Sequence, residues 1–404
     1  MDRAKPHGEL PFLETQTEAF IDDPNAVLGS GAGRLTMART VFGVELYAYD
    51  LARPCFRDKR YGNRSAAYFA QRGATPPVMT FINNGNFNMM GPEQHARVRA
   101  IMVKGFTPPR VEKARDQIKA LAHELVDGII AGGHCNFVSA FSHFFSIGVV
   151  AAFIGIPRED VRTFDRATTE LRLLGQVPMQ PGLPRLEAAL AVLHDYGNRL
   201  VERKRAQPGE DFVSDLIRVQ QEGGDLSPEE LVWSIAGILL AGHDTTRYQL
   251  AACVRAAIEG GVWEELAAEP KLVPALVNEA MRLYPATPRQ IKILLEDMEI
   301  GGEQFTAGEV VAPNMGAAGR DPAVFPHPDR VDLHRAEPLY DIGFGYGAHF
   351  CLGHALAKAE LVDGMTILTR RLTEVVIDGP MEMKPTGVIA GLEVLPIRYR
   401  VRAA

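Results

Sequence analysis

Residues 344–357 read FGYGAHFCLGHALA, and this stretch decides how the rest of the chain is interpreted. Cys351 lies in its middle among Gly345, Gly347 and Gly353, and an apolar helical pattern follows from about residue 352. Glycines this dense indicate a backbone that turns tightly or admits a flat group close to it. A cysteine just before a helix has its thiolate stabilised by free N–H groups and the helix dipole, which suits a metal ligand. A lone cysteine in such a loop can equally be a small buried apolar residue.

The residues around the cysteine favour the ligand. They resemble the haem-binding signature of the cytochrome P450 family, F-x-x-G-x-H-x-C-x-G-x-x-L-A, and the matching residues are Phe344, Gly347, His349, Cys351, Gly353, Leu356 and Ala357. The resemblance implies a mainly α fold with a minor β part, a long central helix over the haem, and heme b (iron protoporphyrin IX) as cofactor. It further implies that Cys351 is the axial thiolate, which favours O–O cleavage. His349 would then contact a haem propionate, and Phe344 would pack beside the sulfur.

A second motif, AGHDTT at residues 241–246, lies inside a long apolar helical pattern. The simplest interpretation is a polar patch that faces solvent, but the apolar residues before it indicate burial, and a buried carboxylate needs a reason. The motif resembles the family's oxygen-activation motif, A/G-G-x-D/E-T-T/S. The resemblance implies that Thr245 orients dioxygen and its waters, that Asp244 relays protons, and that Ala241 faces the haem. We interpret His243 as satisfied packing or a surface side chain, not as a ligand.

Composition bounds the class of protein. The chain has 404 residues, is 46% hydrophobic and carries a formal charge of −7, which argues weakly against nucleic acid or an anionic membrane as a general partner. Its four cysteines are far apart, as in a reducing compartment. Residues 1–15 lack the apolar core of a signal peptide, and the longest apolar run, about residues 144–156, is too short to span a bilayer. We expect one cytochrome P450 domain over residues 1–404, soluble and cytoplasmic.

Helical periodicity dominates after residue 92. Apolar residues recur every three or four positions over 111–129 and 186–200, with a proline- and glycine-rich loop at 175–184 between them. Ser227 and Pro228 open a helix that we expect to run to about residue 259, and another is expected near 272–283. Residues 60–91 are expected to form a long connection, and 297–311 a hairpin turning at Gly301-Gly302.

The resemblance assigns roles to three further sets of charged residues. His95 and Arg99, four apart on one helical face, match a motif that binds haem propionates. The family usually places an arginine five residues before the aspartate of the next strand. Counting back from Asp297 gives Lys292, which we predict takes that role as a point charge, although Arg289 lies nearby. Glu279 and Arg282 match the structural E-x-x-R pair, which we expect to hold the cysteine-bearing segment through Arg320 or a nearby residue.

The resemblance implies a monooxygenase that inserts one atom of O₂ into a hydrophobic small molecule. Electrons would come from NAD(P)H through a separate ferredoxin reductase and a ferredoxin, because the chain has no flavin or iron–sulfur motif. The alternatives are a peroxide-using or NO-reducing haem-thiolate enzyme and a non-catalytic haem-binding protein. By family location the substrate pocket is expected to include Phe87, Met89, Met90, Leu174, Val177, Ile238, Ala286, Thr287 and Ile389. The redox partner is expected to dock on the cysteine side, on a basic patch of Arg97, Lys104, Lys113 and Lys358.

Overall fold

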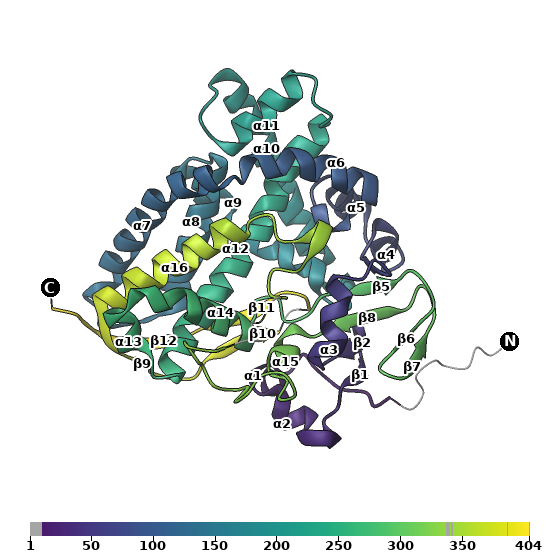
Figure 1. The fold of residues 1–404 in the computed structure, drawn as a ribbon. Coiled ribbons are helices and arrows are strands. Elements are labelled where there is room, and N and C mark those ends of the chain that lie inside the picture. Colours follow the sequence, from purple (N-terminus) through teal and green to yellow (C-terminus); the bar gives the residue numbers. More distant parts are fainter. Residues whose placement is uncertain (1–9, 337–339, 341, 386, 404) are drawn as a thin grey trace.

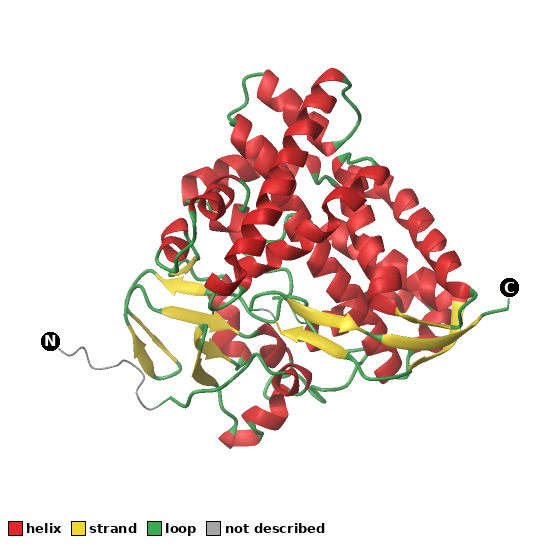
Figure 2. Ribbon diagram, turned by 180° about the vertical axis from the view of Figure 1, so that it is seen from behind, coloured by secondary structure: helices red, strands yellow, loops and turns green. Residues whose placement is uncertain are grey.

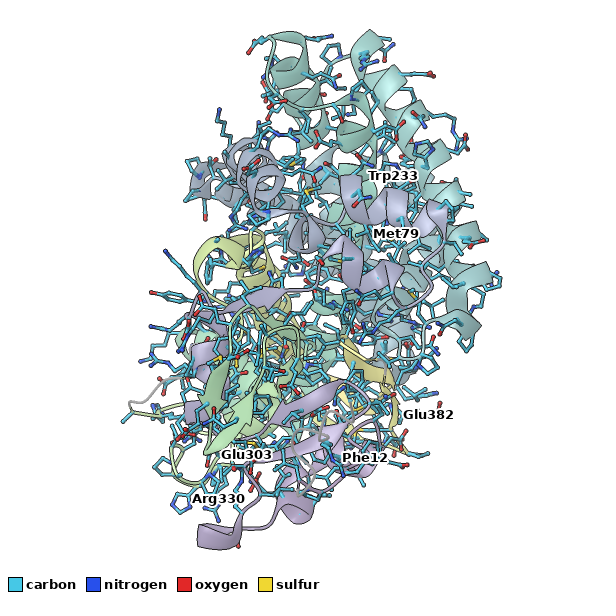
Figure 3. The ribbon with its side chains drawn as sticks, turned by 90° about the vertical axis from the view of Figure 1, so that its right-hand side faces the viewer. Phe12, Met79, Trp233, Glu303, Arg330 and Glu382 are labelled. Atoms are coloured by element: carbon cyan, nitrogen blue, oxygen red, sulfur yellow. The ribbon has the colours of Figure 1, made fainter. Side chains whose placement is uncertain are left out.

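A computed structural model describes residues 10–336, 340, 342–385 and 387–403, so the first nine residues of the chain lie outside the described part. Helices make up most of the described chain, and strands gather at one end of it (Figures 1 and 2). Seen from the side, Met79 and Trp233 lie in the helical part, while Phe12, Glu303 and Glu382 lie in the part that holds the strands (Figure 3).

Helices and short strands follow one another along the described chain. The helices are α1 (Glu18–Asp22), α2 (Pro24–Leu28), α3 (Tyr49–Ala52), α4 (Ala66–Ala70), α5 (Pro76–Asn84), α6 (Pro92–Met102), α7 (Pro108–Ile130), α8 (His143–Ile154), α9 (Val161–Glu170), α10 (Leu183–Ala206), α11 (Phe212–Gln221), α12 (Pro228–Glu259), α13 (Trp263–Ala268), α14 (Val273–Leu283), α15 (Met315–Gly319) and α16 (His354–Arg371). The strands are β1 (Met37–Thr40), β2 (Gly43–Leu46), β3 (Tyr61–Asn63), β4 (His134–Asn136), β5 (Lys292–Leu294), β6 (Met298–Ile300), β7 (Glu303–Phe305), β8 (Val310–Pro313), β9 (Leu372–Ile377), β10 (Glu382–Pro385), β11 (Ala390–Val394) and β12 (Pro396–Val401).

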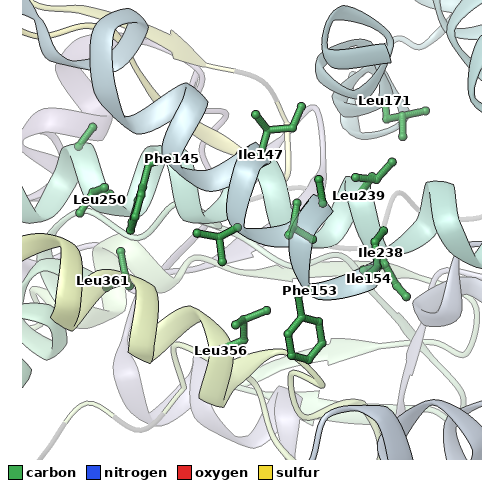
Figure 4. Close-up of a cluster of buried hydrophobic side chains, with 14 of the residues drawn as sticks. Phe145, Ile147, Phe153, Ile154, Leu171, Ile238, Leu239, Leu250, Leu356 and Leu361 are labelled. Atoms are coloured by element: carbon green, nitrogen blue, oxygen red, sulfur yellow. The ribbon is translucent and has the colours of Figure 1, made fainter. Parts of the chain in front are cut away.

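Helix α12 is the long central helix that the sequence predicts. It begins with a complete capping box, in which the Ser227 hydroxyl accepts from the backbone N–H of Glu230 and the Glu230 carboxylate accepts from the N–H of Ser227. Most of its residues are buried on all sides, as expected of a helix at the centre of a core. Figure 4 shows the apolar side chains that fill the space between α8, α12 and α16, including Phe145 of α8, Leu239 of α12 and Leu361 of α16.

Two glycine contacts bring backbone directly against backbone beside this helix. A Cβ on Gly237 of α12 would lie 2.0 Å from the carbonyl oxygen of Gly85, which follows α5. A Cβ on Gly387 would lie 1.6 Å from the carbonyl oxygen of Gly175. Only glycine permits approaches this close.

The strands form four small sheets. The largest has the order β1-β2-β8-β5-β3, in which β2 and β8 are parallel and the other neighbours are antiparallel. Its register places Asn63 of β3 opposite Lys292 of β5. The remaining sheets are β4-β12-β9, β10-β11 and β6-β7. This arrangement agrees with the expectation of a mainly α protein with a minor β part.

Two expectations about local structure need correction. Residues 60–91 are not one long connection, because they contain β3, α4 and α5. Both helices are short, and α5 begins with the prolines of its first turn, which resemble loop residues although they suit the first helical positions. The hairpin is limited to β6 and β7 around Gly301-Gly302, since β8 pairs instead with β2 and β5.

The Glu279–Arg282 pair lies buried on α14 and is bidentate, with Nε–Oε1 and Nη2–Oε2 distances of 2.8 Å. Arg282 also donates to the carbonyls of Gly319, Pro328 and Arg330. The third charged partner is Arg335, whose Nε lies 2.9 Å from Glu279 Oε1. The expectation that Arg320 contacts the Glu279–Arg282 pair is therefore wrong, because the Arg320 guanidinium donates to the Leu283 carbonyl.

The described chain contains no helix that is both long enough and apolar enough to pass through a membrane.

Candidate functional site

A cavity of about 370 Å³ lies beside α12 and reaches the segment that holds Cys351. The residues that line it come from the end of β3, from the turn after α5, from α6, from the middle of α12, from the segment around β5, from the loop before α16 and from the start of α16. The two sequence motifs, more than a hundred residues apart in the chain, therefore border the same space.

The loop around Cys351 is shaped by its glycines. Gly345 and Gly347 have φ angles of +70° and +65°, which side chains rarely adopt. The Cys351 N–H donates to the carbonyl of Phe344 at 2.9 Å, and α16 begins two residues later than the sequence indicates, at His354. Burial raises the pKa of the Cys351 thiol, while the N–H of Gly353 and the nearby guanidinium of Arg99 act against that shift. A bound metal would overcome it, since a coordinating thiol is deprotonated outright.

Two histidines from distant parts of the chain meet at one end of the cavity. The rings of His95 on α6 and His349 stack with their centroids 4.0 Å apart. His95 Nε2 and His349 Nδ1 are buried and have no hydrogen-bond partner among the described residues. Burial lowers both pKa values, that of His349 to about 4. Arg99, one turn after His95, donates to the Phe350 carbonyl at 2.6 Å and also lines the cavity.

Lys292 lies at the cavity and Arg289 does not. Lys292 Nζ donates to Asn63 Oδ1 at 2.6 Å, and burial lowers the pKa of this amine to about 8. Arg289 is turned away and is held by Glu45 at 3.2 Å and by the carbonyls of Thr15 and Gly387. Of the two, only Lys292 is placed to reach a group in the cavity.

The residues of the α12 motif lie on two different faces of the helix. Ala241, Gly242 and Thr245 line the cavity, and the Thr245 hydroxyl donates back to the Ala241 carbonyl at 2.6 Å. Asp244 is 2% exposed and is not among the lining residues. Burial raises the pKa of Asp244 to about 6, although Arg247 pulls it down.

The interpretation of His243 needs correction. The side chain is completely buried, so it is not on the surface, and neither ring nitrogen finds a hydrogen-bond partner among the described residues, so it is not satisfied. Its Nε2 lies 3.7 Å from Asp244 Oδ1, so the ring lies beside the carboxyl. The sequence alone could not show this, because adjacent helical side chains converge only when a neighbouring helix, here α8, confines them.

These residues fit a haem. The thiol of Cys351 offers a soft ligand for iron, and the loop that carries it turns on the left-handed glycines. The cations Arg99 and Lys292 and the unpartnered nitrogens of His95 and His349 lie at the same cavity. Such a set suits the two carboxylates of a protoporphyrin.

Seven of the nine expected pocket residues line the cavity. They are Phe87, Met89, Leu174, Ile238, Ala286, Thr287 and Ile389. Met90 and Val177 do not, which corrects that part of the expectation. Met90 follows the 3₁₀-turn Phe87–Met89 and packs into the main core, and Val177 is partly buried against the same core.

The cavity also contains polar residues that sequence analysis missed. Arg64 lines it, stacks over Phe69 at 5.3 Å, and has its pKa lowered to about 10 by burial. Glu360 of α16 lines it too, and burial without a charged neighbour raises the pKa of this carboxyl well above its ordinary value. The sequence could have indicated this buried carboxyl, because the glutamate stands nine residues after Cys351 inside an apolar helical pattern.

Comparisons with known proteins agree with this geometry. A family model described as Cytochrome P450 matches residues 263–392. The chain is 31% identical to luteothin monooxygenase of Streptomyces thioluteus over 97% of both chains. It is 32% identical to mycinamicin IV hydroxylase/epoxidase of Micromonospora griseorubida over 84% of this chain and 85% of that protein. The structure of cytochrome P450 CYP109Q5 from Chondromyces apiculatus superposes with a TM-score of 0.85 at 24% identity, covering 97% of this chain and 99% of that one. This chain thus belongs to the cytochrome P450 family and is a haem b monooxygenase.

Proposed function

We propose that this monooxygenase oxidises a hydrophobic small molecule with O₂, that the Cys351 thiolate would hold the haem iron, and that Thr245 and Asp244 position and transfer protons. The observation that carries the proposal is that the cysteine loop and the α12 motif border one cavity. The haem supplies O₂ activation when bound. His95, Arg99, His349 and Lys292 would hold its propionates.

The chain's own residues divide the remaining work. The Thr245 hydroxyl, at the cavity wall, orients dioxygen and the waters beside it, and the small side chain of Ala241 leaves room for them. Asp244 lies behind that wall, and with a pKa of about 6 it can both hold and release a proton near neutral pH. Apolar side chains such as Phe87 and Ile238 exclude bulk water and receive the substrate's apolar body.

The lining of the cavity bounds the class of substrate. The relatives' names include a steroid C26-monooxygenase and a pentalenic acid synthase, and one solved relative holds myristic acid. These names differ too widely to assign a substrate to this chain. The polar lining residues Asn86, Asn88 and Gln290 favour a substrate that carries at least one hydrogen-bonding group on an apolar body.

The first test is the absorption spectrum of the reduced protein under carbon monoxide. We expect the red-shifted band of thiolate-bound haem, and its loss in Cys351→Ser. A wild-type protein without that band, or a variant that keeps it, would refute the ligand assignment. Thr245→Ala should keep the band and consume oxygen, but divert it to peroxide. Unchanged coupling of oxygen to product would favour the peroxide-using alternative. Spin-state changes on titration with candidate molecules would then identify the substrate.

We also propose that electrons come from a ferredoxin and an NAD(P)H-dependent ferredoxin reductase. We place the protein in the cytoplasm, a reducing compartment in which four free cysteines stay reduced. The expected basic docking patch is smaller than the sequence suggests. Arg97 is held by Glu230 at 2.6 Å, and Lys113 by Glu210 at 2.7 Å.

Lys104 and Lys358 are exposed and make no ion pair with the described residues, and Lys358 Nζ lies 5.6 Å from the centre of the Phe344 ring in the cysteine loop. Lys104→Gln and Lys358→Gln should each flatten the salt dependence of electron transfer. Lys113→Gln, which removes a charge already paired, is the matched control. Rates that do not vary with ionic strength in the wild type would exclude this docking surface.

A further inference from the structure

Five buried polar atoms, which belong to Asp244 and two neighbouring side chains of α12, have no hydrogen-bond partner among the described residues. They are Nδ1 and Nε2 of His243, Oδ1 and Oδ2 of Asp244, and Nε of Arg247. The three side chains are 0%, 2% and 4% exposed. Arg247 Nη2 lies 3.1 Å from Asp244 Oδ1, an ion pair that leaves both carboxylate oxygens without an aligned donor.

So many orphaned buried groups in one place point to bound water. A buried polar group without a partner destabilises the folded state, and native proteins satisfy such groups by holding ordered waters with two to four polar contacts. His243 and Asp244 together offer two ring nitrogens and two carboxylate oxygens, with Nε2 and Oδ1 3.7 Å apart. That distance is too long for a direct hydrogen bond.

The cluster approaches the surface on the α8 side through a second histidine. The His143 and His243 rings meet edge to face, with centroids 4.9 Å apart. His143 Nε2 lies 3.8 Å from Asp165 Oδ2, and these side chains are 17% and 23% exposed. Ser146 of α8 donates to the His243 carbonyl at 2.6 Å and so fixes the two helices against each other here.

On the other side of the cluster, where the Glu393 side chain is 28% exposed, the groups carry fixed charges. Glu393 Oε1 accepts from Tyr248 at 2.5 Å and from Arg172 at 2.9 Å, and Arg247 Nη2 lies 3.3 Å from it. Burial raises the pKa of Glu393, but Arg247, Tyr248 and Arg172 outweigh it and leave that pKa below its ordinary value. A carboxylate with no proton and arginines that never lose one are poor carriers.

The histidines are suited to carry protons. Burial, with the charge of Arg247, lowers the pKa values of both His243 and His143. Each ring is therefore neutral at physiological pH and has one nitrogen that donates and one that accepts. A proton from water can arrive at one ring nitrogen while the proton on the other nitrogen leaves. The ring stays neutral, only N–H and O–H bonds exchange, and no electron moves.

We propose that ordered waters bound by His243 and Asp244 form a proton passage that enters beside Asp165, runs along His143 and His243, and ends at Asp244. This inference rests on the proposed function, in which Asp244 delivers protons to the cavity through the waters at Thr245. His243 and His143 are positioning and relay residues, since neither lines the cavity.

The test begins with a crystal structure of the wild-type holoenzyme at high resolution. We expect ordered water within hydrogen-bond distance of His243 and of Asp244, and a dry cluster would overturn the proposal. His243→Phe and His143→Phe keep an aromatic ring and remove its nitrogens. Each should lower product formation about tenfold, below the roughly hundredfold expected of a whole proton donor, and should raise the solvent deuterium isotope effect and the peroxide yield. His194→Phe is the matched control, because His194 stacks on Trp233 at 4.6 Å, away from the cluster.

The outcomes separate this inference from the proposed function. Wild-type protein without the thiolate-type carbon monoxide band would refute the function itself. If that band and the wild-type rate are normal, and both histidine variants keep the wild-type rate and isotope effect, the histidine passage is refuted and the function stands. If only one variant folds, as judged by its carbon monoxide band, that variant decides.

Discussion

The buried carboxyl of Asp244 should make a contribution to the stability of this protein that falls as pH rises. Its pKa moves from 3.8 in the unfolded chain to about 6 in the folded protein, chiefly because burial disfavours the charge. This side chain therefore binds its proton more tightly in the folded state than in the unfolded state between about pH 4 and pH 6. The stability that Asp244 contributes is greatest below that window and is lost as pH rises through it. A shift of about two pKa units at about 1.4 kcal/mol each gives a loss of roughly 3 kcal/mol.

Asp244→Asn removes this titration without changing the shape of the side chain. We expect the free energy of unfolding of the variant, relative to wild type, to increase by roughly 3 kcal/mol between pH 4 and pH 7. Urea unfolding of the haem-loaded proteins at half-unit pH steps measures it. Asp50→Asn is the matched control, because it makes the same change at an exposed carboxyl. A constant difference between Asn variant and wild type across the range would refute the reasoning, since it would mean that Asp244 is ionised throughout.

Three further changes test the fold and the site. Glu279→Gln leaves two buried guanidinium groups without their carboxylate and should lower the free energy of unfolding in urea by about 3–5 kcal/mol. Glu264→Gln, the control at an exposed ion pair, should lower it by less than about 1 kcal/mol. Equal losses would contradict a structural role for the buried pair. Gly237→Ala forces a Cβ to within 2.0 Å of a backbone oxygen and should destabilise the protein and weaken ligand-induced spectral shifts, while Gly128→Ala, in open space on α7, should stabilise it by about 1 kcal/mol; a stable Gly237 variant would argue against the contact. Lys292→Met should speed haem transfer to an apo-globin acceptor by roughly ten- to a hundredfold, the loss expected of one charged hydrogen bond, and an unchanged rate would remove Lys292 from the propionate site.

The sequence predicted the parts of this protein that depend on short-range patterns. The bounds of α12 follow from its capping box and apolar run, and the cavity residues on α6, α12 and the cysteine loop follow from motifs with fixed spacing. The sequence could not show which way a side chain turns when the decision belongs to a distant segment. Arg335 rather than Arg320 reaches Glu279, because the chain folds back there. Asp225 and Glu230 neutralise Arg97 from across the fold. The orphaned state of His243 depends on α8, a hundred residues earlier in the chain.

The contacts of Gly237 with Gly85 and of Gly387 with Gly175 join segments that border the cavity by main chain alone. Because no side chain lies between the two backbones, a change of side-chain rotamer cannot relieve these contacts. Any widening of the cavity therefore has to come from other segments that line it. Laboratory evolution toward bulkier substrates should therefore find its useful changes elsewhere, because a Cβ at Gly85, Gly237 or Gly387 would lie within 3.0 Å of a backbone oxygen.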